Sequence, residues 1–443
     1  MKFLLIKIKK YIFEKLPADS LRRRFARGIF WTIASNIVTQ LLAVISSIIL
    51  ARILGKTSFG EYGMINSTVG LFGIFAGMGL GLTSTKYVAE YRKTDPQKAG
   101  KVITVTTTLA VLTGGLLGIL LFIFAPFLAK HIINAPHLVG TLRIASGLLL
   151  FGSINGAQTG VLSGFEAFKT IAWVGVLTGL FSFPTMLIGA YYFNVRGVVA
   201  AIVMILIFAS VANRIALNKK LKEFNIALDY TTITKEMSII WKYSIPSMAA
   251  GVMVAPVTWA ANSILVNAPN GYAELGIFNA ANQWKNALMI LPSLISMVFI
   301  PILSERYGNH DKDSIDRTFN INIYLNCIVT LPFAMIFALF SKSIMSLYGL
   351  DFTAGWHVMI IMLLVAILVN MQLPVLNLLA ARGDMWVRFL LNLIWAIIFL
   401  AIFYFNRNHN AKGMALAFLF SYVFYNIFSF GYRHYIKTRP YYA

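Results

Sequence analysis

The sequence has little charge, and most of the charge it has is positive. Charged residues make up 12% of the 443 positions, whereas hydrophobic residues make up 58%. Soluble domains carry roughly 25% charged and about 45–50% apolar residues, so a water-soluble fold of this length is excluded. Lysine and arginine outnumber aspartate and glutamate by 38 to 16, which gives a net charge of +22. Lipid is therefore the expected solvent for most of the chain.

Cysteine is nearly absent, and the sequence offers no metal or nucleotide motif. The single Cys327 lies in an apolar run, which excludes a disulfide framework and a cysteine metal site. The six histidines lack metal-ligand spacing. The segment Gly55-Lys-Thr-Ser58 resembles the end of a phosphate loop, but Leu50 stands where that motif requires its first glycine. We therefore expect no cofactor, no metal and no enzymatic activity.

What the sequence does contain is a series of apolar stretches close to the ~20 residues that a membrane-spanning helix requires. They predict an all-α integral membrane protein with about 12 transmembrane helices. The predicted spans are 28–51, 60–82, 102–125, 143–163, 169–191, 197–217, 241–266, 273–301, 321–341, 356–379, 386–405 and 413–432.

The basic residues lie mainly on one side of this map. The side that holds the N-terminus carries 29 of the 38, the other side carries 8, and Lys285 falls within a span. This asymmetry predicts that both termini are cytoplasmic in a bacterial inner membrane. Residues 1–27 form a basic tail, either amphipathic on the membrane surface or solvated. Because the charge is spread over seven segments, we expect no nucleic-acid partner.

An offset of about 216 residues superimposes the two sets of six spans. It aligns Arg196-Gly197 with Lys412-Gly413, and Gly60 with Gly276. Parallel six-helix halves imply a pseudo-two-fold axis along the membrane normal and a central cavity between two lobes. Coincidental spacing of apolar segments is the alternative. The predicted division is an N-lobe at 28–217, a cytoplasmic linker at 218–240, a C-lobe at 241–434 and a cytoplasmic tail at 435–443.

Several short motifs at corresponding places carry a family resemblance. They are the runs Arg27-Gly-Ile-Phe-Trp31-Thr-Ile-Ala-Ser-Asn36, Leu50-Ala-Arg52-Ile-Leu-Gly55, Phe59-Gly-Glu-Tyr62, Gly79-Leu-Gly81, Lys86-Tyr-Val-Ala-Glu90-Tyr and Gly276-Ile-Phe-Asn279-Ala-Ala-Asn282-Gln-Trp284-Lys-Asn, with Pro292 after the last. The chain resembles the polysaccharide-transport family (O-antigen flippase, Wzx-type) of the MOP exporter superfamily.

This resemblance implies a transporter that flips polyprenyl-diphosphate-linked oligosaccharide across the inner membrane by alternating access. The cargo would be an O-antigen (lipopolysaccharide), capsule or exopolysaccharide repeat unit. The implied partners are the lipid-linked oligosaccharide, membrane lipids, a polysaccharide polymerase and a chain-length regulator, with H⁺ or Na⁺ as the coupling ion or the membrane potential alone as the drive.

Lys285 is the most informative single residue because it lies midway along a predicted span, where a cation costs roughly 2.5–3.5 kcal/mol to insert. We expect it either to face the cavity and pair with the substrate diphosphate, or to be a snorkelling or structurally paired lysine. Asn282, three residues earlier, is expected on the same helix face.

Other candidates are polar residues at the ends or in the middle of spans. The resemblance carries over Arg52 as a residue at the cavity mouth, although an interfacial anchor is equally consistent with its position. Arg27 is expected to be a positive-inside residue or a phosphate contact. Asn66 and Asn279 are the further cavity candidates among the amides in spans, which must face protein or water. Those amides are Asn36, Asn66, Asn155, Gln158, Asn262, Asn279, Asn282, Gln283, Asn370, Gln372 and Asn377.

A hinge is predicted in the seventh span. Pro246, Gly251 and Pro256 should bend that helix because each proline removes a backbone hydrogen bond. The resemblance favours a hinge between lobes over mere irregularity.

Three alternatives to the O-antigen flippase remain at this point. A multidrug exporter of the same superfamily would favour acidic cavity residues. A membrane-embedded polymerase or ligase would need a large outer loop, and every predicted outer loop is short. A sporulation-type or peptidoglycan-precursor flippase performs chemistry too similar to separate by sequence.

Overall fold

The computed structural model describes residues 21–229, 252–308 and 312–438, and the part it describes is helical without a strand. Every predicted span coincides with a described helix, except for the first part of span 241–266, which lies outside the described residues. The elements are α2 (Leu21–Gly77), α3 (Leu80–Tyr91), α4 (Pro96–Phe127), η1 (Leu128–Ile132), η2 (Pro136–Leu138), α5 (Val139–Gly164), α6 (Phe168–Glu223), α9 (Val254–Val266), α10 (Gly271–Gly308), α11 (Lys312–Leu339), α12 (Ser341–Ser346), η4 (Leu350–Gly355), α13 (Trp356–Arg382), α14 (Met385–Asn406), η5 (Arg407–His409) and α15 (Asn410–Thr438).

Two of these helices each contain two membrane spans joined by an abrupt reversal. In α2 the chain turns back at Gly55 (φ 72°, ψ 171°), and in α6 at Asn194 (φ 52°, ψ −141°). A positive φ is readily available to glycine and, among other residues, to asparagine. Asn410, which lies 216 residues after Asn194, has nearly the same backbone conformation (φ 51°, ψ −131°). The repeat offset found in the sequence therefore recurs in the backbone.

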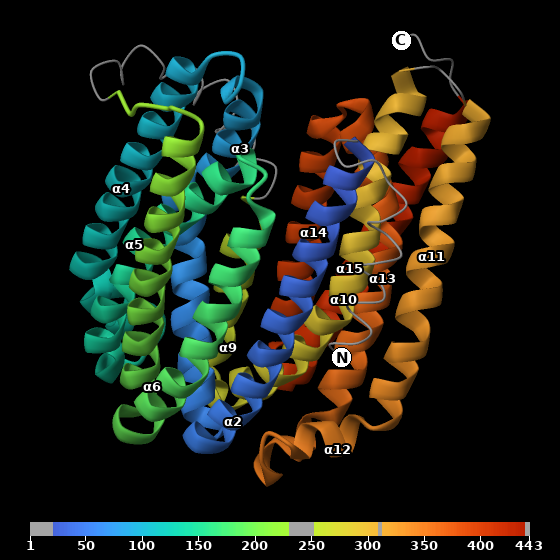
Figure 1. The fold of residues 1–443 in the computed structure, drawn as a ribbon. Helices are drawn as coiled ribbons and strands as arrows, with labels where there is room; N and C mark the ends of the chain where they lie inside the picture. The colour runs from blue at the N-terminus through green and yellow to red at the C-terminus, as the bar shows by residue number, and fades with distance from the viewer. Residues whose placement is uncertain (1–20, 230–251, 309–311, 439–443) are drawn as a thin grey trace, which may run out of the picture.

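The sequence repeat assigns α2 to α6 to an N-lobe and α9 to α15 to a C-lobe. In Figure 1, α3 to α6 lie in one group and α10, α11, α13, α14 and α15 in the other, with the first segment of α2 seen against the second group. The groups converge at the end of the molecule where Gly55 lies and diverge toward the end where α2 begins and α15 ends (Figure 1). We call these the Gly55 end and, after the orientation that the sequence predicts, the inner end. The predicted architecture of two six-helix lobes is confirmed.

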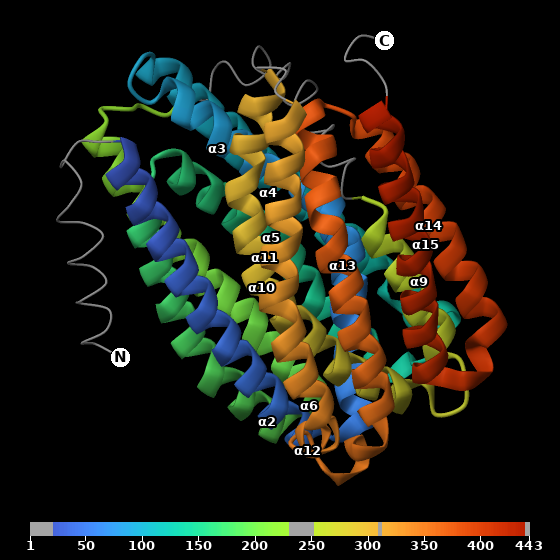
Figure 2. The same cartoon turned by 90° about the vertical axis from the view of Figure 1, so that its right-hand side faces the viewer.

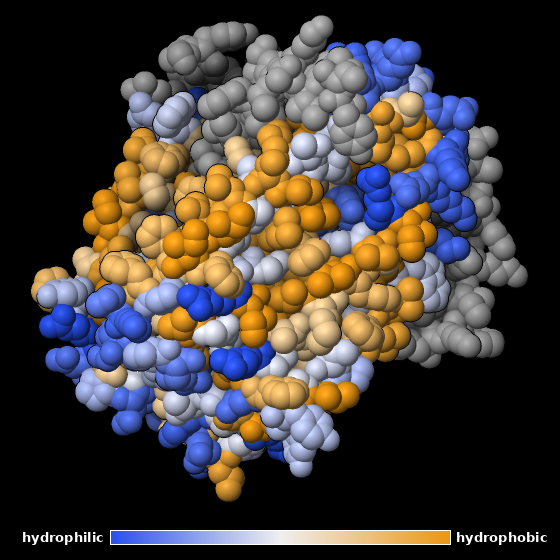
Figure 3. All heavy atoms as spheres, turned by 90° about the vertical axis from the view of Figure 1, so that its left-hand side faces the viewer, coloured by the Kyte–Doolittle hydropathy of each residue, from blue (hydrophilic) through white to orange (hydrophobic). Residues whose placement is uncertain are grey.

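The outer surface of the bundle is apolar, as expected for helices that contact lipid. On α4, Leu112, Leu116, Ile119 and Ile123 are 59–62% exposed and recur on one helical face. Figure 3 shows apolar residues in a broad band across one face, with polar residues toward both ends. By length and composition, seven helical stretches in the described chain suffice to cross a membrane, and three of them, 53 to 56 residues long, reverse at Gly55, Asn194 and Asn410.

Different interactions hold each lobe together. In the N-lobe, the buried Arg92 guanidinium donates to the Gly164 carbonyl (2.8 Å) and pairs with Glu166, which ties α3 to the end of α5. In the C-lobe, Trp395 and Phe399 of α14 stack on each other (ring centroids 5.5 Å apart), and Phe418 of α15 packs 4.3 Å from Phe399. The C-lobe interior is therefore an aromatic cluster.

Candidate functional site

The lobes touch most closely where α2 crosses α10, near the Gly55 end. A Cβ atom at Gly60 would lie 1.8 Å from the Tyr272 carbonyl oxygen, and one at Gly276 would lie 2.1 Å from the Lys56 carbonyl oxygen. Gly60 corresponds to Gly276 in the repeat, and Lys56 corresponds to Tyr272. The contact is thus self-complementary, as at a two-fold interface.

Hydrogen bonds at the same end join the lobes further. The Tyr272 hydroxyl donates to the Ile133 carbonyl (2.7 Å), and the Asn267 amide donates to the Ile132 carbonyl (2.7 Å). The Arg52 guanidinium donates to the Leu347 carbonyl. These bonds run from one lobe to a connecting segment of the other, so they help to close this end.

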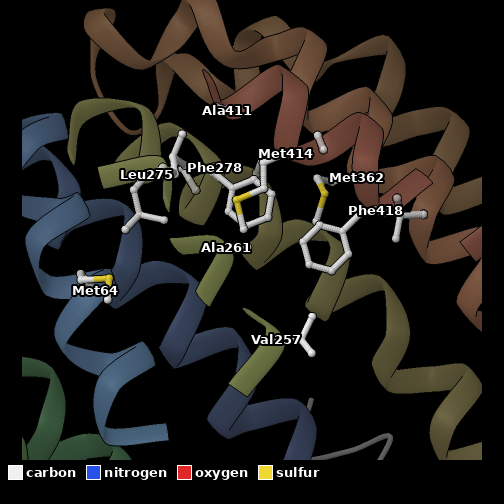
Figure 4. Packing of buried hydrophobic residues seen from close by; sticks show 14 of the residues in the cluster. Met64, Val257, Ala261, Leu275, Phe278, Met362, Ala411, Met414 and Phe418 are labelled. Carbon is white, nitrogen blue, oxygen red and sulfur yellow. The ribbon is translucent and has the colours of Figure 1, made fainter. Parts of the chain in front are cut away.

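Apolar packing supports this closure. Met64 of α2, Ala261 of α9 and both Leu275 and Phe278 of α10 belong to one buried cluster that spans both lobes (Figure 4). Phe59 of α2 packs edge to face against Phe352 of η4 in the C-lobe, with ring centroids 6.1 Å apart.

A central cavity of about 710 Å³ lies between the lobes, within the ~300–1,000 Å³ range of small-molecule sites. Its walls come from both segments of α2, from α6, and from α9 and α10. The residues that line it are Thr39, Leu42, Ala43, Ser46, Ser47, Leu50, Phe59, Tyr62, Gly63, Asn66, Ser67, Gly175, Thr178, Gly179, Ser182, Met186, Ile205, Thr258, Asn262, Phe278, Asn279, Asn282, Gln283 and Asn286.

Repeat-equivalent residues face this cavity in pairs. Each pair is separated by 216 positions, and its two members come from opposite lobes. The pairs are Leu42 and Thr258, Ser46 and Asn262, Tyr62 and Phe278, Gly63 and Asn279, Asn66 and Asn282, and Ser67 and Gln283. The cavity therefore lies on the pseudo-two-fold axis that the sequence repeat predicts.

The cavity lining is polar but uncharged. None of its described lining residues is charged. Three lining amides carry a buried atom without a hydrogen-bond partner in the described chain, namely Asn262 Oδ1, Asn279 Nδ2 and Asn282 Oδ1. Buried polar atoms are normally paired, and leaving one unpaired costs roughly 1–3 kcal/mol. The amides beside the cavity therefore keep hydrogen-bonding capacity that the described chain does not use.

Lys285 does not line this cavity. Its ammonium lies 5.7 Å from the ring centroid of Phe418 in the C-lobe. Phe418 in turn stacks on Phe278, a cavity-lining residue, at 5.8 Å between ring centroids. Its predicted pairing with a diphosphate stays a prediction.

The other sequence candidates fall into three groups. Asn66, Asn279 and Asn282 are brought together at the cavity. Arg52 is exposed and lies at the Gly55 end, on the Leu347 carbonyl. Arg27 is a helical residue near the start of α2, away from that end.

The predicted hinge is only partly described. Pro246 and Gly251 lie outside the described residues. Pro256 is the third residue of α9, a position whose N–H has no partner within the helix, so proline does not disrupt helical hydrogen bonding there. The hinge remains a prediction.

Sequence reasoning missed part of the lining. Asn286 extends the amide face of α10, and its spacing from Asn279 and Asn282 could have revealed it. Ser46 and Ser47 give the first segment of α2 its polar face, a signal that is weak because serine is common in membrane helices. In the described chain, no group of three or more histidine, cysteine or acidic side chains could hold a metal ion.

A second space, a groove of about 320 Å³, lies between the first segment of α2 and helices α10 and α11. Figure 2 shows how these three helices are arranged. Its lining is almost entirely apolar: Ile37, Gln40, Leu41, Val44, Ile45, Trp284, Ala287, Leu288, Ile290, Leu291, Val329, Phe333 and Phe337. The same two helices, α2 and α10, thus present a polar face to the cavity and an apolar face to the groove.

Comparison with known curated proteins gives relatives that are exporters or sporulation proteins by name. The chain is 23% identical to the "EPS I polysaccharide export inner membrane protein EpsE" of Ralstonia nicotianae over 197 residues, which is 42% of this chain and 44% of EpsE. It is 22% identical to "Stage V sporulation protein B" of Bacillus subtilis over 310 residues, 64% of this chain and 59% of that protein. The chain thus matches less than two thirds of the length of either.

Among solved structures, the fold is similar to an inward-facing conformation of a multidrug resistance MATE family transporter of the MOP superfamily. The TM-score is 0.77 at 13% identity, and the match covers 90% of this chain and 94% of that one. This similarity concerns the fold alone.

Two family profiles match the chain. One, MatE, matches residues 246–406. The other, described as "Polysaccharide biosynthesis protein", matches residues 25–307, well over half of the chain. The resemblance found in the short motifs is confirmed: the chain belongs to the polysaccharide biosynthesis protein family and is a multi-pass membrane protein.

Proposed function

We propose that this transporter flips polyprenyl-diphosphate-linked oligosaccharide across the bacterial inner membrane, with both termini in the cytoplasm. The observation that carries the proposal is the two-sided character of α2 and α10. One side of each helix lines the polar cavity, and the other lines the apolar groove. A substrate with a polar head and a long hydrocarbon chain fits this pair of spaces.

The groove suits a lipid chain for energetic reasons. Ile37, Leu41 and Ile45 are 38–59% exposed along it, so its side walls are already apolar surface. Exposing a CH₂ group to water would cost about 0.8 kcal/mol, and a polyprenyl chain in the groove avoids this cost because it stays in a hydrocarbon environment throughout. The head alone would then need a polar path across the membrane.

With the inner end at the cytoplasm, the closed Gly55 end is periplasmic. The described state would then be closed outward, and the head would enter from the cytoplasmic side. Opening of the contact between Gly60 and Gly276 would complete alternating access. EpsE is named as a polysaccharide export protein, which supports the same cargo class. The further proposed partners are a polysaccharide polymerase and a chain-length regulator, and the proposed drive is H⁺ or Na⁺ coupling or the membrane potential alone.

The test is reconstitution of the full chain in liposomes that contain a fluorescent polyprenyl-diphosphate oligosaccharide. Flipping is measured as loss of protection from a membrane-impermeant glycosidase added outside. We expect the chain to expose inner-leaflet substrate faster than protein-free liposomes do. Equal flipping rates with and without the chain would refute the proposal. If the chain instead exported a cationic dye, the result would favour a multidrug exporter.

A further inference from the structure

The charge of the central cavity carries information about which part of a substrate it receives. Its described lining contains hydroxyls, amides and aromatic rings, with neither an acidic nor a basic side chain. A diphosphate removed from water into such a lining would lose hydration without gaining a counter-charge. An uncharged sugar loses only hydrogen bonds, which amides can replace.

The unpaired amides point to the same class of ligand. Asn262 is 95% buried, and its side chain donates to the Ser67 hydroxyl (2.9 Å) while Oδ1 has no partner in the described chain. Asn282 Oδ1 is likewise unpaired in the described chain, whereas Asn279 Nδ2 packs against Gly63. A sugar hydroxyl or the N–H of an acetamido group can donate to these two amide oxygens.

Aromatic residues complete the cavity. Tyr62 and Phe278 occupy repeat-equivalent positions and line it from opposite lobes, with Phe59 beside Tyr62 (ring centroids 6.2 Å apart). A pyranose ring has apolar C–H faces, which pack against aromatic rings. A sugar has polar hydroxyls around its edge and apolar C–H groups on its faces, so amides arranged around aromatic rings suit both parts of its surface.

From these observations we infer that the central cavity binds an uncharged sugar unit of the substrate, hydrogen-bonded from opposite lobes by Asn66 and Asn282, and that the diphosphate stays outside the cavity lining. This inference rests on the proposed function for the identity of the whole substrate. It adds that the chain selects uncharged glycans over acidic ones.

The first experiment measures equilibrium binding to the purified full chain in nanodiscs. The probes are two uncharged oligosaccharides, chitotetraose and maltotetraose, the acidic tetragalacturonate, and inorganic pyrophosphate. We expect an uncharged probe to bind at least tenfold more tightly than tetragalacturonate, and pyrophosphate not to displace it. Equal or tighter binding of tetragalacturonate, displacement by pyrophosphate, or no binding of either uncharged probe would overturn the inference.

Variants locate the binding. Asn66→Ala and Asn282→Ala should each weaken binding of the uncharged probe about fivefold, whereas Asn320→Ala, an amide exposed on α11, should leave it unchanged. Asn282→Lys should shift preference toward tetragalacturonate by at least tenfold, a gain that a misfolded protein cannot produce. If sugar binding is unchanged in Asn66→Ala and Asn282→Ala, the sugar lies elsewhere. The same conclusion follows if Asn282→Lys does not change the preference between the probes.

Flipping separates this inference from the proposed function. Liposomes carrying the same lipid diphosphate with either an uncharged or an acidic glycan are compared. Faster flipping of the acidic glycan would leave the flippase intact and overturn the sugar assignment. Sugar binding without any flipping would support the sugar assignment and refute the proposed flippase function.

Discussion

The N-lobe and the C-lobe meet at equivalent residues, yet they contribute differently to the cavity. At the crossing, both lobes supply glycine, Gly60 and Gly276. In the lining, the N-lobe often has a smaller group where the C-lobe has an amide, as at Gly63 against Asn279. The scaffold is symmetric, whereas the amide side chains that line the cavity belong mainly to the C-lobe.

Ser46 against Asn262 and Ser67 against Gln283 follow the same pattern. The mid-span cation is also one-sided, since the position equivalent to Lys285 in the N-lobe is Val69. Symmetry thus governs how the lobes close, while departures from symmetry govern what the cavity can bind. Substitutions at four places in the molecule test whether symmetric residues govern closure and asymmetric residues govern binding.

The largest effect is expected at the symmetric crossing. Gly60→Leu or Gly276→Leu places a side chain into the backbone of the opposite lobe, and overpacking of this kind costs roughly 1–3 kcal/mol or more. The two lobes cannot then close at the Gly55 end, and flipping should fall more than tenfold in either variant.

Gly70→Leu is the matched control because it lies on the same helix with open space around it. Its flipping rate should stay within twofold of the unaltered chain. Near-normal flipping by Gly60→Leu or Gly276→Leu, measured in the same liposomes, would show that this contact does not take part in the cycle.

Substitution of Lys285 tests the contribution of a residue that breaks the symmetry between the lobes. If it attracts the diphosphate, Lys285→Ala should lower flipping about tenfold and Lys285→Glu still further, with sugar binding to the cavity unchanged because Lys285 lies outside the lining. Comparing flipping rates with sugar affinity in one preparation checks this. Unchanged flipping in both variants would exclude the role.

A smaller effect is expected in the groove between the lobes. Ala287→Trp fills space that the apolar groove offers on α10, so flipping of the polyprenyl substrate should fall about fivefold while affinity for the free sugar is retained. Ile328→Trp, a 67% exposed position on α11 next to groove residue Val329, is the control. Equal rates in the two variants would argue against a lipid chain in the groove.

The smallest effect should come from Arg52. Its bond to the Leu347 carbonyl is at an exposed position, where a charged hydrogen bond contributes about 1 kcal/mol or less. Arg52→Gln should change the flipping rate about twofold by loosening the closed end. A loss as large as that of Gly60→Leu would indicate a direct role in substrate handling.

The fold could be predicted from the sequence further than the site could. Apolar runs and the 216-residue offset identified the helices and lobes because lipid imposes length and composition on every span. Asn66, Asn279 and Asn282 were found as cavity residues for a related reason, since amides within spans must face protein or water.

Lys285 shows where such reasoning ends. Spacing of three residues suggested that it shares a face with Asn282. The four lining amides of α10 instead centre on a direction about 110° away from Lys285, at 100° per residue. A spacing of three residues relates only two side chains, so it does not fix which side of the helix faces the cavity. The four amides taken together do fix that side. The apolar groove also escaped prediction, because it is formed by helices remote in the sequence.

The crossing of Gly60 and Gly276 has an evolutionary consequence. Two copies of a single six-helix chain, inserted in the same orientation, would meet around a two-fold axis through one self-complementary patch. The carbonyls of Lys56 and Tyr272 against the opposite glycines retain that reciprocity within one polypeptide. If a single six-helix gene had been duplicated and fused, one substitution to glycine in that gene would have cleared both sides of this contact.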